Sequence, residues 1–209
     1  MSLTRFQPRT IHLCGLPAGL ALLAALASMP GRNFLEASMA RHMLVQFPLL
    51  MLCGALLAGG LSAALAKSAA VRQIAVSSWN AHGMTGLFGT TLVLAVLMIP
   101  RVLDLALVNP WIELAKIAAL VACGAAVYMS WRPAGWLVQG FFLGQLLPMM
   151  AVAGTLYESS PTRVCNAYLL DDQVLLGQLL VWIAASIALV WLAALFQSLI
   201  KKSAAATAA

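Results

Sequence analysis

Long uninterrupted apolar runs constrain this chain more than any other feature. Six stretches each hold close to 20 mostly apolar residues, at 13–30, 43–66, 83–100, 111–130, 135–157 and 174–200. A helix rises about 1.5 Å per residue, so about 20 such residues cross a hydrocarbon core of about 30 Å. The runs are rich in Ala and Leu and do not alternate, which favours helices over a β-barrel. The sequence therefore predicts an all-α, polytopic transmembrane bundle of about six spans, forming a single domain over residues 1–209.

The composition excludes several classes of protein. Of the 209 residues, 63% are hydrophobic and only 9% are charged, whereas soluble domains average about 25% charged residues. A soluble globular protein, a disordered chain and a nucleic-acid-binding domain are all excluded on this ground. The formal net charge of +6 is then best interpreted as loop charge that orients the bundle in a membrane.

The distribution of Lys and Arg predicts the orientation. One set of helix ends holds Arg5, Arg9, Lys67, Arg72, Arg132, Lys201 and Lys202, and the other holds Arg32, Arg41, Arg101 and Arg163. Cytoplasmic loops carry the excess of positive charge, so seven against four predicts a bacterial-type inner (cytoplasmic) membrane protein with both termini inside. For the first run there is an alternative: Arg5 and Arg9 before it, and Ala25-Leu26-Ala27 near its end, also fit a cleaved signal peptide.

Two charges lie inside an expected span. Glu113 and Lys116 are three residues apart, on one face of a helix. The pattern predicts an internal ion pair near the outer interface, where the lysine can extend its ammonium toward water. A proton relay is the alternative, although the span lacks the further carboxylates that a pump uses.

Soft donors gather in the outer half of the expected bundle. Met39, His42 and Met43 are spaced i, i+3, i+4, so a helix there presents all three on one face. Further methionines in the same half are Met29, Met98, Met149 and Met150. Thioether and imidazole ligands suit Cu(I), so copper binding is one hypothesis. The other is that methionine serves as a flexible apolar filler.

The remaining histidines and cysteines carry weaker signals. His12 and His82 are expected at the starts of helices near the cytoplasmic face. They are either ordinary interfacial residues or a pair that could ligate a haem from two helices. Cys14, Cys53, Cys123 and Cys165 form no CxxC motif, and Cys165 is expected to be a free thiol on the outer loop. Phosphate-binding, metalloprotease and nucleophile motifs are absent from the sequence, so we expect no enzymatic activity.

The order of several short motifs is more informative than any one of them. They are Phe34, Ser38-Met39, His42-Met43, Pro48 and Gly54; His82; Met98-Ile99-Pro100 and Leu103-Asp104-Leu105-Ala106-Leu107; Glu113; Tyr128 to Trp131; and Leu156-Tyr157, Asp172-Gln173, Gly177 and Trp182. Over roughly residues 34–196 this order resembles the CtaG-type cytochrome c oxidase assembly factors. The chain departs from that family's histidines at Ser38, Met98 and Leu114 and from its tyrosine at Leu103, and the family has more spans.

The resemblance implies a non-enzymatic protein that assists copper handling or assembly of a haem–copper cytochrome oxidase. Met39, His42, Met43 and Met98 would then be the copper ligands, and Asp172 would hold the loop that closes the site. The expected partners are haem–copper oxidase subunits and the lipid bilayer. The alternative is an accessory transmembrane subunit of a larger respiratory complex with a degenerate metal site. Its helices would pack through small residues such as Gly54, Gly59, Gly60, Gly83, Gly86, Gly89, Gly140 and Gly144.

Overall fold

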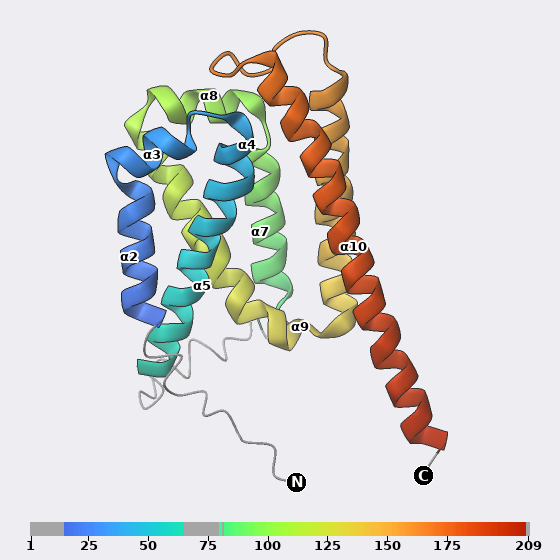
Figure 1. Ribbon diagram of the computed structural model, residues 1–209. Coiled ribbons are helices and arrows are strands. Elements are labelled where there is room, and N and C mark those ends of the chain that lie inside the picture. The colour runs from blue at the N-terminus through green and yellow to red at the C-terminus, as the bar shows by residue number, and fades with distance from the viewer. Residues whose placement is uncertain (1–14, 65–79, 81, 208–209) are drawn as a thin grey trace.

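The computed structural model describes residues 15–64, 80 and 82–207, and all regular secondary structure in these ranges is helical. The elements are α2 (Gly15–Ala27), α3 (Met29–Leu35), α4 (Met39–Arg41), the π-helix η1 (His42–Gln46), α5 (Phe47–Ala64), α7 (Met84–Leu97), α8 (Pro100–Val108), α9 (Pro110–Ser159) and α10 (Leu170–Thr207). Figure 1 shows the long helices side by side, with α3 and α8 lying across one end of the bundle. The all-helical fold class is confirmed.

Capping residues explain why the short helices begin where they do. Ser28 caps α3, because its side-chain oxygen accepts the backbone N–H of Gly31, and Pro30 occupies the first turn. Asn109 caps α9 in the same way through the backbone N–H of Trp111. Pro110 follows at the first helical position. The N-terminal turn of α9 carries Glu113, where a carboxylate is favoured by the positive end of the helix dipole.

Helix α9 turns back on itself at Gly135. This residue has φ 60° and ψ 174°, a backbone conformation that is essentially restricted to glycine. Pro133, two residues earlier, removes a backbone donor from the helix. Figure 1 shows that the first arm of α9 descends from α8 and the second arm rises beside α10. As a result, Pro110 and Ser159, the two ends of α9, lie at the same end of the bundle.

Among the described residues, three helices are long and apolar enough to cross a membrane. They are Met39–Ala64, which joins α4, η1 and α5, then Pro110–Ser159 and Leu170–Ile200. A fourth span results if α7 and α8, which meet at an angle of 77°, are counted as one broken span. Six separate spans are not confirmed in the described residues. The described part of the expected span 13–30 contains the 13-residue helix α2 and the start of α3, and the expected spans 111–130 and 135–157 are joined within α9.

Glycines allow the closest helix contacts of the bundle. A Cβ on Gly124 of α9 would collide with the backbone carbonyl of Met51 in α5, and one on Gly54 would collide with that of Val121. Gly154 and Gly177 bring the second arm of α9 and α10 together in the same manner. Small residues at such crossings are typical of membrane bundles, where close packing replaces hydrophobic driving force. These contacts fix the first arm of α9 against α5, and therefore Glu113 and Lys116 opposite His42.

Candidate functional site

A buried polar cluster lies at the α8 end of the bundle, where an apolar interior would be expected. It contains Arg32, Glu36, His42, Gln46, Glu113, Lys116 and Tyr168, which we call the ionic cluster. His42 and Gln46 are fully buried, and Glu113 and Lys116 are each 2% exposed. The members come from α3 and the turn after it, from η1, from the start of α9 and from the loop before α10.

Lys116 is the centre of the ionic cluster. Its Nζ lies 2.7 Å from His42 Nε2, 3.1 Å from Gln46 Oε1 and 2.7 Å from Glu113 Oε2. Glu36 Oε1 is 3.6 Å away. An ammonium can only donate, so Nε2 of His42 accepts from it. The ring proton of a neutral His42 is then on Nδ1, which donates to the Tyr168 hydroxyl at 2.6 Å.

Arg32 closes the cluster on its more exposed side. Its Nε lies 3.4 Å from Glu36 Oε1 and 3.5 Å from Glu113 Oε1. With neutral His42, two cations face two carboxylates, so the cluster carries no formal net charge. Charges taken out of water are tolerated only when they are paired in this way, and removing one partner of a buried pair costs about 3–5 kcal/mol. The cluster therefore ties α3, η1 and α9 to one another.

Glu36 has the clearest electrostatic signature outside the candidate spans. Burial raises the pKa of Glu36, but the hydrogen bond from Gln46 and the charges of Lys116 and Arg32 outweigh it and hold the pKa below its usual value of 4.5. The Gln46 amide donates to Glu36 Oε1 at 3.1 Å. Glu36 is therefore a carboxylate at neutral pH and a fixed negative member of the cluster.

The π-helical turn η1 sets the positions of His42 and Gln46. A π-helix has i→i+5 hydrogen bonds and is wider than an α-helix, so residues four apart lie close to one face. His42 and Gln46 are four apart, and both contact the Lys116 ammonium. Single π-turns inside α-helices are frequent at functional sites, and this one lies at the most polar point of the bundle interior.

The loop before α10 holds Tyr168 over His42. Asp104 of α8 accepts the backbone N–H groups of Asn166 and Ala167. Gln173 of α10 donates to the Tyr157 carbonyl at 2.9 Å and accepts the backbone N–H of Val164 at 2.8 Å. Burial, with a smaller effect of the Glu36 charge, raises the pKa of the Tyr168 phenol. Tyr168 therefore stays neutral and acts as a hydrogen-bonding lid.

The residues expected to bind copper only partly come together. Met39, His42 and Met43 are all buried, at 0%, 0% and 5% exposure, and the two methionines belong to one hydrophobic core cluster. Met98, Met149 and Met150 pack against the same core, whereas Met29 is 74% exposed. Asp172 stands apart: it is half-buried at the start of α10 and accepts a hydrogen bond from Ser38 Oγ at 3.2 Å.

Both ring nitrogens of His42 are already engaged, by Lys116 and by Tyr168. Within the described residues, no group of three or more His, Cys, Asp and Glu side chains is arranged to hold a metal ion. A copper ion could therefore reach the imidazole only by replacing one of these two hydrogen bonds. The thioethers of Met39 and Met43 lie in apolar surroundings, where no such exchange is needed.

Other sequence expectations have mixed outcomes. The Glu113–Lys116 ion pair is confirmed at 2.7 Å, but Lys116 does not extend toward water, because its side chain is 1% exposed. Cys165 is a free cysteine as expected, and its side chain is buried, at 1% exposure. Burial, with a contribution from Asp104, raises the pKa of the Cys165 thiol to about 12. His82 is exposed, and His12 lies outside the described residues.

Sequence reasoning does not place Glu36, Gln46, Arg32 or Tyr168 in one site with His42. For Gln46 a signal exists, because an amide inside an apolar run needs a buried partner. Glu36 and Arg32 have the pattern of ordinary loop charges, and Tyr168 is separated from His42 by 126 positions. No sequence periodicity relates residues so far apart along the chain.

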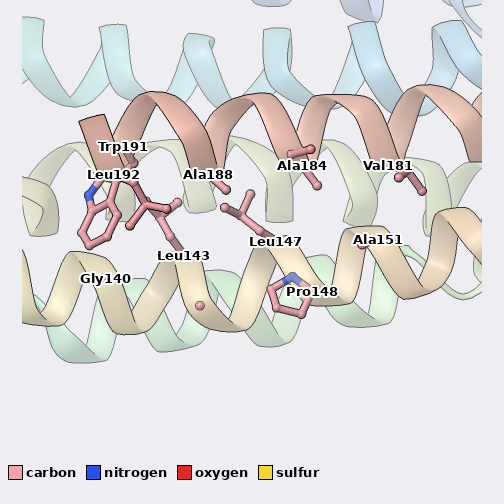
Figure 2. Close-up of a pocket in the computed structure, with 12 residues that line it drawn as sticks. Gly140, Leu143, Leu147, Pro148, Ala151, Val181, Ala184, Ala188, Trp191 and Leu192 are labelled. Atoms are coloured by element: carbon pink, nitrogen blue, oxygen red, sulfur yellow. The ribbon is translucent and has the colours of Figure 1, made fainter. Parts of the chain in front are cut away.

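Apolar grooves also line the bundle away from the ionic cluster. One groove of about 410 Å³ runs between the second arm of α9 and α10. Figure 2 shows Gly140, Leu147 and Pro148 on one wall and Ala184 and Trp191 on the other. Gly144, which also lines the groove, faces open space. This surface suits a lipid tail or a partner helix, not polar chemistry.

No protein-family model, curated protein or solved structure matches this chain.

Proposed function

We propose that this chain is a six-span membrane protein, with both termini in the cytoplasm, that handles Cu(I) during assembly of a haem–copper oxidase and has no enzymatic activity. The observation that carries the proposal is the burial of Met39, His42 and Met43 together, with Met98 packed against the same core. Thioethers and an imidazole form a soft donor set that suits Cu(I). The order of motifs that resembles the CtaG-type assembly factors is the second support.

The six-span arrangement is supported by the lengths of the arms of α9. The turn at Gly135 divides α9 into arms of about 25 residues, each about 37 Å long at 1.5 Å per residue. Each arm alone is long enough to cross about 30 Å of hydrocarbon. Together with α2, α5, α7 and α10 they make the six segments of the proposed bundle, of which α2 is described over 13 residues.

In this proposal Asp172 has a positioning role. Its carboxylate accepts a hydrogen bond from Ser38 Oγ, and Ser38 directly precedes Met39. The start of α10 is thereby tied to the segment that carries the thioethers. Asp172 does not ligate copper here; it restrains the loop that covers His42 through Tyr168.

Copper content tests the proposal. The full-length protein, purified in mild detergent and loaded with Cu(I) under anaerobic conditions, should retain near-stoichiometric copper after washing. A variant with Met39→Leu, His42→Ala and Met43→Leu should lose most of it. Met29→Leu is the matched control, because Met29 is exposed and outside the core, and it should leave copper content unchanged. Wild-type protein that retains no copper would contradict the proposal.

A second candidate function is that of an accessory subunit of a larger membrane complex. It is favoured by α10, because only 11% of the most apolar stretch of this helix is buried against the rest of the chain. The open groove beside α10 is a second observation in its favour. Gly144→Leu tests this candidate cleanly, since nothing lies within 4 Å of the position that its Cβ would take. Gly140 is unsuitable, because the Trp191 ring lies 2.8 Å from where a Cβ on Gly140 would be. Loss of a co-purifying complex with unchanged stability would support the subunit; an unchanged complex would count against it.

A further inference from the structure

Every acidic side chain of this protein belongs to the α8 end of the bundle. The six are in the turn after α3, in α8, at the two ends of α9 and at the start of α10: Glu36, Asp104, Glu113, Glu158, Asp171 and Asp172. Figure 1 shows the turn of α9 and the C-terminal part of α10 at the opposite end. Arg132 lies three residues before Gly135, at that turn, and is exposed. Its guanidinium therefore has no acidic side chain to pair with.

A long apolar groove begins at the same end. The groove of about 410 Å³ between the second arm of α9 and α10 adjoins a cavity of about 450 Å³, and both are lined by Leu143 and Trp191. The second cavity is also lined by Trp131 and Trp136, which lie on either side of the α9 turn. Along α10 the two cavities together cover residues 181–194, about 20 Å at 1.5 Å per residue. We call them the α10 groove.

The α10 groove has the length and the lining of a site for one lipid tail. The hydrocarbon core is about 30 Å thick, so one leaflet accounts for about 15 Å, and a groove of about 20 Å covers that depth. Its two polar side chains, Gln139 and Ser186, donate to the backbone carbonyls of Trp131 and Trp182 at 2.7 and 2.8 Å. The rest of the lining is apolar, aromatic or glycine.

Tryptophans gather where the groove meets the turn of α9. The ring centroids of Trp136 and Trp191 are 6.2 Å apart, and the Trp131 ring packs edge-on against Phe142 at 6.3 Å. Tryptophan is enriched where a membrane meets water, with its ring at the level of the lipid headgroups. Arg132 directly follows Trp131 in the sequence. The guanidinium is therefore at headgroup level, beside the mouth of the groove.

We propose that the α10 groove binds one anionic phospholipid, with a tail between the second arm of α9 and α10 and the phosphate at Arg132. A guanidinium matches phosphate in charge and in hydrogen-bond geometry, and basic pockets between transmembrane helices bind anionic headgroups. Lys201 and Lys202, further along α10, add positive charge beyond the groove. The site is independent of copper and shares with the proposed function only the six-span arrangement.

Quenching of tryptophan fluorescence by lipids with brominated tails tests the proposal. Replacing the other three tryptophans, by Trp79→Phe, Trp111→Phe and Trp182→Phe, leaves only those of the groove. The full-length protein is placed in phosphatidylcholine vesicles, which receive increasing fractions of either brominated phosphatidylglycerol or brominated phosphatidylcholine. The variants are Arg132→Gln and the charge-keeping Arg132→Lys. Arg163→Gln is the matched control, because Arg163 is an exposed arginine in the loop at the α8 end.

We expect half-maximal quenching at an about fivefold lower fraction of phosphatidylglycerol than of phosphatidylcholine, the factor that one cation near the membrane surface supplies. Arg132→Lys and Arg163→Gln should keep this preference, and Arg132→Gln should remove it. High salt should weaken it in the wild type, because the guanidinium is exposed. Equal quenching by the two lipids in the wild type would overturn the proposal, as would a preference that survives Arg132→Gln.

Gly144→Leu tests where the tail lies. Nothing is within 4 Å of the position that a Cβ on Gly144 would take, so the leucine enters the groove without displacing a neighbour. Quenching at a given fraction of phosphatidylglycerol should then be weaker than in the wild type. Unchanged quenching would contradict the tail site. Wild-type protein that is quenched by neither lipid would show that a protein helix covers the groove, and would also overturn the proposal.

The lipid site and the copper function fail separately. Wild-type protein that retains Cu(I) but shows no headgroup preference would refute the lipid site alone. A preference that depends on Arg132, in a protein that retains no Cu(I), would refute the copper function and leave the lipid site standing.

Discussion

At the scale of single residues, the described part of the molecule gathers its buried charges around one lysine. Lys116 contacts His42, Gln46 and Glu113 directly, and Arg32 holds the carboxylates from the other side. Every one of these groups would be costly to bury alone. The cluster is therefore stable only as a set, and removing one member leaves the remaining buried groups without a partner.

The first prediction concerns pH and Glu36. Its folded pKa lies below the ordinary value of 4.5. A carboxyl whose pKa is depressed by folding contributes stability that is present above its unfolded pKa and is lost as pH falls through the folded pKa. We expect the thermal stability of the detergent-solubilised protein to fall as pH drops below about 4.5.

Glu36→Gln should be less stable than the wild type at pH 7 and should lose less stability on acidification. The exposed Glu158→Gln serves as the control and should behave like the wild type. An acid-induced loss of the same size in Glu36→Gln and the wild type would show that Glu36 is not the group responsible.

The sequence predicts the residues of the site unevenly. Met39, His42 and Met43 can be grouped because helical spacing relates them, and Glu113 and Lys116 for the same reason. That the two groups meet could not be predicted, since 74 positions separate His42 from Lys116. Their contact depends on how α5 packs against α9, which is set by backbone approach at Gly54 and Gly124.

At the scale of helices, the glycines of α9 have different structural roles. Gly124 permits contact between α9 and the α5 backbone, whereas Gly144 lies on the same helix with open space around it. Gly135 does neither; its positive φ makes the turn of α9. Sequence spacing alone does not separate these roles, because Gly140 and Gly144 have the GxxxG spacing that usually indicates packing.

The second prediction compares Gly124→Ala with Gly144→Ala. The added methyl at position 124 meets the Met51 carbonyl, and such overpacking typically costs about 1–3 kcal/mol. At position 144 the same change should be neutral or stabilising by up to about 1 kcal/mol, because alanine favours helix. Unfolding in mixed detergent micelles measures both; a Gly124→Ala variant as stable as Gly144→Ala would contradict the packing of α5 on α9.

The helical runs themselves are the most predictable part of the fold. Apolar length locates α5, α7 and both arms of α9 within a few residues, because the bilayer requires such runs, whereas α10 extends beyond the expected end, to Thr207. It could not show that α7 bends by 77° into α8, since the bend depends on Pro100 and on the Tyr157 hydroxyl, which donates to the Met98 carbonyl at 2.6 Å.

At the scale of the whole molecule, the two ends of the bundle differ in polarity. The ionic cluster, α3, α8 and the loop before α10 lie at one end, and Figure 1 shows the turn of α9 and the C-terminal part of α10 at the other. Between them the described interior is largely apolar or glycine-rich. The buried charges of the described residues are therefore concentrated at the α8 end of the bundle.

The third prediction tests this arrangement in a membrane. In a background whose native cysteines are replaced by serine, Asn109→Cys and Ser159→Cys should react with an impermeant maleimide from one side of sealed inner-membrane vesicles, and Arg132→Cys from the other. The proposed orientation puts Arg132 in the cytoplasm, so only Arg132→Cys should react in inside-out vesicles. Labelling of all three from the same side would show that the arms of α9 do not cross.

The π-helical turn at His42–Gln46 has a consequence for how the chain tolerates insertions and deletions. A π-turn contains one residue more than an α-turn, because its hydrogen bonds reach i+5 instead of i+4. Deleting Leu44 would therefore let Met39–Ala64 become a regular α-helix with its contacts to α9 preserved. The deletion would leave His42 and Gln46 three residues apart, so the angle between their side chains around the helix axis would change, and with it their joint contact with Lys116. Here the number of residues, and not only their identity, makes the site.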